Sequence, residues 1–169
     1  MFQVGDKILY PMHGAGTIEA IEEKEVLGEK SLYYLLNIPH LNTKIMIPIK
    51  KAENLGIREI VKPDIIENVL NLFYEGTTDP IIFENQRYCS DMNKKKIKTG
   101  DIYKGTEIIR DLMRKSQRNK LGAEDIKMLT NARQIFISEL VQVKGIAQEQ
   151  AVDLLDQIVR STSEETSCN

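Results

Sequence analysis

The sequence contains no tryptophan, and only two cysteines and two histidines, in 169 residues. Cys89 and Cys168 are too few for a disulfide framework or a thiolate metal cluster. No apolar run approaches the roughly 18 residues that a membrane-spanning helix needs. The N-terminus shows no basic segment followed by an apolar one, so no signal peptide is expected. These absences predict a cytoplasmic protein without a metal, a cofactor or a membrane contact.

Catalytic groups are equally sparse. A nucleophilic site would need Cys89 or a serine beside a histidine. His13 and His40, however, both fall in the first 40 residues, far along the chain from Cys89. The Gly14–Gly16 pair lacks the third glycine and the Lys-Ser/Thr pair of phosphate-binding loops. We therefore expect no enzymatic activity and no small-molecule substrate.

Hydrophobic periodicity divides the chain into two halves. Short, β-rich segments with turn residues between them predict strands at residues 7–10, 17–22, 31–38 and 44–49. From Pro63 onward the apolar residues recur at helical spacing, which predicts helices over 63–76, 82–97, 102–113, 126–143 and 151–159. The predicted fold class is α+β: a small antiparallel Tudor- or SH3-like barrel (1–60), an all-α domain (61–160) and a flexible tail (161–169).

A net charge of −2 conceals a strongly uneven distribution. Residues 63–85 contain five acids and no base, whereas residues 86–120 contain eleven bases against four acids. Clustered Lys and Arg are typical of a phosphate-backbone partner. The alternative is a solvated helix face with local ion pairs and favourable contacts to a helix C-terminus.

Two groups of side chains stand out within the basic stretch. Arg110, Arg114 and Arg118 are spaced four residues apart, so they line one side of a helix. The second group combines cations with aromatic rings that could meet a sugar–phosphate backbone and an exposed base. Its members are Phe83, Arg87, Tyr88, Lys94, Lys95, Lys96 and Lys98.

Several motifs resemble the CarD/CdnL family of bacterial transcription regulators. In the β half these are residues 4–7, 10–16, 19–21, 33–36, 47–48 and 54–58; in the helical half they are residues 99–101, 108–114, 122–129 and 132–135. The resemblance implies a Tudor-like barrel that binds the β subunit of RNA polymerase. It also implies a helical domain that contacts promoter DNA at the upstream edge of the melted region and stabilises the open complex.

The resemblance carries over unevenly to individual residues. On the polymerase-facing strands Lys24 occupies a basic family position. Met46 stands where the family has an arginine. Lys44, two residues away on the same strand face, can substitute for that arginine. In the DNA-contacting part, Gln86-Arg87-Tyr88 stands where the family has Arg-Arg-Tyr. The predicted DNA-binding set is Phe83, Gln86, Arg87, Tyr88, Lys94, Lys95, Lys96, Lys98 and Lys127.

The family's wedge tryptophan aligns with Glu84, and Phe83 is the nearest aromatic residue. Because one residue along a helix rotates a side chain by ~100°, Phe83 is an imperfect substitute. Two hypotheses follow. Either the protein, monomeric when free, binds polymerase and promoter DNA, or it binds polymerase as an adaptor or competitor with little DNA contact.

Overall fold

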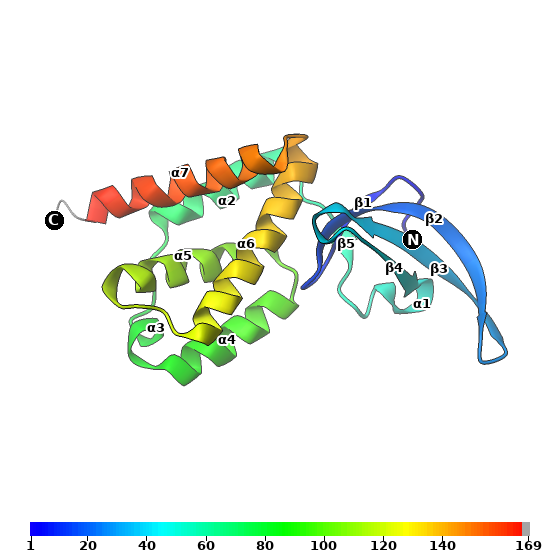
Figure 1. The fold of residues 1–169 in the computed structure, drawn as a ribbon, viewed down its shortest axis with the longest axis horizontal. Helices are drawn as coiled ribbons and strands as arrows, with labels where there is room; N and C mark the ends of the chain where they lie inside the picture. The colour runs from blue at the N-terminus through cyan, green and yellow to red at the C-terminus, as the bar shows by residue number, and fades with distance from the viewer. Residues whose placement is uncertain (167–169) are drawn as a thin grey trace.

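The computed structural model describes residues 1–166, and it contains a bent antiparallel sheet followed by a helical domain (Figure 1). The strands are β1 (Lys7–Tyr10), β2 (Gly14–Val26), β3 (Glu29–Ile38), β4 (Thr43–Pro48) and β5 (Arg58–Glu59), in the order β4-β3-β2-β1-β5. Two short helices, η1 (Pro39–Leu41) and α1 (Ile49–Ala52), flank β4. The α+β prediction, an N-terminal antiparallel sheet followed by an all-α domain, is confirmed.

Alternation along the strands buries one face of the sheet and leaves the other open. Tyr34, Leu36 and Ile38 of β3 point into the barrel core, where they meet residues of the other strands and of the α1–β5 segment. The intervening residues of β3 lie on the outer face, because successive side chains of a strand point to opposite sides. A bulge between Ile18 and Ala20 shifts the register of β2 against β3, and such bulges strengthen the local twist.

In the part of the chain that the structure describes, six helices form the second domain. Their bounds are α2 (Pro63–Glu75), α3 (Ile81–Glu84), α4 (Gln86–Lys98), α5 (Ile102–Arg118), α6 (Ala123–Lys144) and α7 (Gln148–Thr166). Pro63 begins α2, and Gly145 ends α6 with a left-handed φ of 62°. Figure 1 shows α2 and α7 side by side on one side of the domain and α4 on the opposite side. None of the helices, over the described residues, is long and apolar enough to cross a membrane.

Two boundaries differ from the predictions. The helix predicted over 82–97 is divided at Asn85, where the backbone is extended. The Asn85 side chain accepts a hydrogen bond from the Tyr88 amide and so caps α4. Within the range predicted as a tail from residue 161, α7 continues to Thr166. The Ser161 hydroxyl donates to the Gln157 carbonyl and is hydrogen-bonded to the Tyr74 hydroxyl. The last part of the predicted tail, residues 167–169, lies outside the described residues.

A buried ion pair joins the two domains. Arg58 of β5 donates from both terminal nitrogens to the Glu139 carboxylate on α6, at 2.7 and 3.0 Å. Arg58 also donates twice to the Gly100 carbonyl, while Glu139 accepts a third bond from the Val61 amide at 3.0 Å. One pair thus connects the sheet, the interdomain segment, the α4–α5 turn and α6.

The β1–β2 turn provides a second junction. The Ala15 amide donates to the Ser138 hydroxyl at 3.0 Å. Close approach requires glycine here, because a Cβ at Gly14 would overlap the His40 ring and because Gly14 has a φ of +115°. The Tyr-Pro-Met-His-Gly-Ala-Gly segment at 10–16 is therefore the place where the sheet docks on α6.

Candidate functional site

One face of α4 concentrates the exposed positive charge. Cys89, Asn93 and Ile97 fix the helix by packing against the domain core. Five charged residues of α4 are exposed on the side that points away from the core: Arg87, Asp91, Lys94, Lys95 and Lys98. All of them except Asp91 are cations. We call these five residues the α4 face. The α4 face has a net charge of +3 on a rigid helix, an arrangement that is typical of surfaces that bind a phosphate backbone.

The lysines of α4 differ in what they already bind. Lys96 pairs with Glu107 of α5 at 2.9 Å, and its side chain is mostly covered. Lys94 lies 3.8 Å from Glu124, an exposed and therefore weak contact. Arg87, Lys95 and Lys98 form no ion pair with any residue in the described part of the chain. These three cations are consequently the ones that are free to bind phosphate.

A groove runs beside the α4 face, between α4 and α6. Its volume is about 430 Å³, and Lys94, Lys98 and Lys127 line it. Ile97 and Met128 give the groove apolar surface, and Met12 of the β1–β2 turn reaches into its lining. Met12 was not among the predicted site residues. Its left-handed φ of 69° and its exposure are unusual for methionine, and hydrophobic periodicity gives no signal for either property.

The side chain of Gln86, at the first position of α4, is committed to a network around a buried carboxylate. Its amide donates to Asp125 at 3.0 Å and its carbonyl accepts a short bond from Lys115. Lys115 in turn pairs with Asp125 at 2.8 Å, and Asp125 is buried. The polar atoms of Gln86 are thus engaged within the helical domain, and its place in the DNA-binding set stays a prediction.

The arginine row of α5 lies on one side of the helix, as its spacing predicted, but this side contacts other parts of the protein. Arg110 is buried, bonds to Asp111 at 3.0 Å and donates to the Thr77 carbonyl at 3.1 Å. Arg114 donates to the Thr78 hydroxyl at 3.0 Å, and burial followed by the charge of Arg110 lowers the Arg114 pKa. The row therefore holds the segment between α2 and α3 against α5.

Phe83 belongs to the same arrangement. The Arg118 guanidinium lies 3.8 Å from the centroid of its half-buried ring, a cation–π contact that holds the ring in place. Tyr88, by contrast, is 39% exposed on α4. Tyr88 is therefore the more accessible aromatic ring next to the α4 face.

The predicted polymerase-binding residues share the outer face of the sheet. Met46 lies opposite Leu35 and Lys44 opposite Asn37, which places both on the outer face of β4. Lys24 lies on the same face of β2, opposite Ser31. Lys44 pairs with Glu19 at 2.8 Å, whereas Lys24 makes only a 3.9 Å contact with Glu22. We call this surface the outer sheet face; Ala20, Tyr33, Leu35 and Pro48 complete it.

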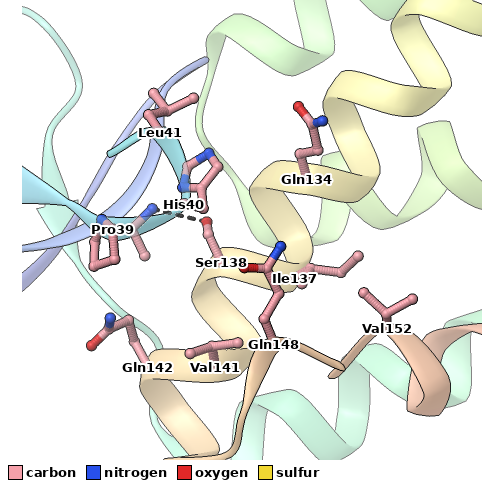
Figure 2. Close-up of a pocket in the computed structure, with 11 residues that line it drawn as sticks. Pro39, His40, Leu41, Gln134, Ile137, Ser138, Val141, Gln142, Gln148 and Val152 are labelled. Atoms are coloured by element: carbon pink, nitrogen blue, oxygen red, sulfur yellow. Dashed lines mark hydrogen bonds between the residues drawn. The ribbon is translucent and has the colours of Figure 1, made fainter. Parts of the chain in front are cut away.

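A smaller cavity of about 240 Å³ lies at the domain junction (Figure 2). Figure 2 shows His40 on the barrel side, with Ser138 and Gln148 across from it on the helical side. The His40 Nδ1 atom is buried and has no hydrogen-bond partner among the described residues, and burial lowers the pKa of His40. Cys89 is buried far from both histidines in sequence, and burial raises the pKa of its thiol. No cluster of three His, Cys, Asp or Glu side chains within residues 1–166 could hold a metal.

Two family models match the chain in succession. The model described as CarD-like/TRCF RID domain matches residues 2–61, and the model described as CarD, C-terminal domain, matches residues 68–156. The chain belongs to the CarD-like family. The matched ranges fall on the sheet domain and the helical domain, and the first domain type points to an interaction with RNA polymerase.

Similar proteins include YdeB from Bacillus subtilis (strain 168), a candidate transcription factor by its name. It is 45% identical over 150 residues, which cover 89% of this chain and 97% of YdeB. The N-terminal domain of Myxococcus xanthus CarD, solved by solution NMR, is 30% identical, with a TM-score of 0.31 over 35% of this chain and 79% of that structure. This CarD-like chain is accordingly a transcription regulator by family.

Proposed function

We propose that this CarD-like protein binds the β subunit of RNA polymerase through the outer sheet face and promoter DNA through the α4 face. DNA contact next to the melted region would stabilise the open complex. The observation that carries the proposal is the α4 face itself, where Arg87, Lys95 and Lys98 are exposed and without an ion pair in the described chain.

The mechanism needs no chemistry. A ligand shifts an equilibrium only by its differential affinity for the two states. A protein held on polymerase presents the α4 face to the DNA at a high effective concentration. Each phosphate contact that exists in the open complex and is absent in the closed one then favours opening. The junction formed by Arg58 and Glu139 supports this proposal, because it fixes the α4 face relative to the outer sheet face.

The outer sheet face suits a protein partner. Tyr33, Leu35 and Met46 are half-buried in its centre, and Lys24 and Lys44 lie at its edge. A partly apolar centre with a charged rim is the usual anatomy of a protein–protein interface. Met46 supplies apolar contact where the family has an arginine, so binding through this interface depends less on charge here than in relatives that keep the arginine.

Salt dependence of binding to a polymerase–promoter complex tests the DNA contact. The Lys95→Glu/Lys98→Glu variant should lower the slope of log K against log salt by about 1.8, because each phosphate that a lysine neutralises contributes ~0.9 to the slope. Lys62→Glu/Arg160→Glu changes the net charge equally at two exposed positions, the residue that caps α2 and a residue of α7. Figure 1 shows these two helices on the opposite side of the domain from α4. This control should retain the wild-type slope.

The alternative function is that of a polymerase-binding adaptor or competitor with little DNA contact. Two observations favour it: the chain has no tryptophan, and Phe83 is held by Arg118. In that case both double variants would bind the promoter complex with the wild-type slope, while binding to polymerase alone persisted. An identical slope for all three proteins would therefore select the adaptor.

A further inference from the structure

The β2–β3 hairpin extends beyond the rest of the sheet. β4 ends at Pro48, which lies opposite Tyr33, so residues 23–32 pair only with one another. Figure 1 shows this two-stranded ribbon extending from the rest of the sheet on the side away from the helical domain. Its tip is the two-residue loop Leu27-Gly28, enclosed by the pair Val26 and Glu29.

Leu27 is unusual for a leucine in both its backbone conformation and its exposure. Both loop residues have positive φ, 52° for Leu27 and 81° for Gly28, as a type I′ turn requires. Asn, Asp or Gly adopt this backbone readily, whereas leucine is strained there. Leu27 is also 100% exposed, so no contact within the described chain compensates for either the strain or the hydration of its side chain.

The neighbouring residues extend this apolar surface. Val26 is 51% exposed and lies two residues after Lys24, which places both on the same side of β2. The outer sheet face therefore continues along β2 from Ala20 through the charged residues Glu22 and Lys24 to Val26 beside the tip. Single exposed apolar residues are common on proteins. Val26 and Leu27 are adjacent, Leu27 is strained, and both lie at the end of a proposed interface, which together favours contact with a partner.

We propose that Val26 and Leu27 insert into an apolar depression on RNA polymerase, next to the surface that the outer sheet face binds. This inference rests on the polymerase contact proposed above. Together with Glu22 at its base, the ribbon carries Glu23, Glu25 and Glu29 against Lys24 and Lys30, a net charge of −2. Charge complementarity then requires basic residues around the depression.

The substitution Leu27→Asn separates a binding role from a structural one. Asparagine is favoured before glycine in a type I′ turn, so the variant should unfold at the same temperature as wild type or at a higher one. Removing a fully buried leucine from an interface should nevertheless weaken binding of the full-length protein to RNA polymerase about tenfold to a hundredfold. Leu55→Asn, at another exposed leucine in the turn after α1, serves as the matched control and should bind like wild type.

Four results are possible, and each decides the matter. A loss of affinity in Leu27→Asn with unchanged thermal stability supports the proposal. Wild-type affinity in Leu27→Asn overturns it, and so does self-association of the wild type that this substitution abolishes, because the tip would then bind a second copy of the chain. Failure of the wild type itself to bind polymerase would overturn the proposed function and this inference together.

Discussion

Removal of Arg58 should be far more damaging than its partial exposure suggests. The side chain of Glu139 is only 2% exposed, and in Arg58→Ala it would keep a single partner, the Val61 amide. Breaking a buried ion pair by removing one partner typically costs about 3–5 kcal/mol, because a charge is left buried without compensation. The Gly100 carbonyl would also lose both of its bonds from Arg58.

A second substitution makes this reasoning testable. Glu139→Gln removes the charge while its carbonyl can still accept from Val61. The double variant Arg58→Ala/Glu139→Gln should therefore be more stable than Arg58→Ala alone, by about 1–3 kcal/mol. Urea unfolding followed by circular dichroism measures both free energies. For a chain of this size, the single variant should lose roughly 6–20 °C in Tm.

The argument would be refuted if the effects of the two substitutions on the free energy of unfolding simply added. If Glu139→Gln lowered the stability of Arg58→Ala further, the unpaired carboxylate would not be the source of the loss. Arg58→Lys provides a control, because it retains the charge but loses the fork that reaches Glu139 and Gly100 together. Its free energy of unfolding should fall between those of wild type and Arg58→Ala.

Two other buried groups lead to predictions of their own. Arg110→Met should lower the free energy of unfolding in urea by about 3 kcal/mol, because buried Asp111 would keep the Thr78 hydroxyl as its one partner in the described chain. The same variant should leave the salt slope of promoter-complex binding unchanged. A reduced slope would mean that the arginine row contacts DNA. Burial lowers the His40 pKa below its ordinary value of 6.5, so the unfolded chain binds this proton more readily and stability should decline as the pH falls below 6.5. His40→Gln should weaken this decline, and an identical pH profile of unfolding free energy in both proteins would contradict the assignment.

Hydrophobic patterning predicted the architecture well, because alternation and helical stripes record which face of each element is buried. Residues 31–38 formed a strand and the stripe from Ile126 to Val143 a helix, both near the expected bounds. The break at Asn85 was missed because a capping side chain interrupts a helix without changing its apolar pattern.

Charge positions were harder to interpret. Spacing placed Arg110, Arg114 and Arg118 on one side of a helix, but it could not indicate that this side faces Thr77, Thr78 and Phe83. Gly76 is a signal that becomes evident only with the structure, because a Cβ there would overlap the Arg110 guanidinium. Similarly, Lys95 and Lys98 were distinguishable from Lys96 only after the position of Glu107 was known.

The lifetime of the open promoter complex tests the central proposal most directly. Full-length protein at saturating concentration should lengthen this lifetime, by about 5- to 150-fold for a typical coupling of 1–3 kcal/mol. Lys95→Glu/Lys98→Glu should lose most of this effect while it still binds polymerase, and Lys62→Glu/Arg160→Glu should retain it. Equal lengthening by all three proteins, or none by the wild type, would contradict the proposal that the α4 face stabilises melted DNA.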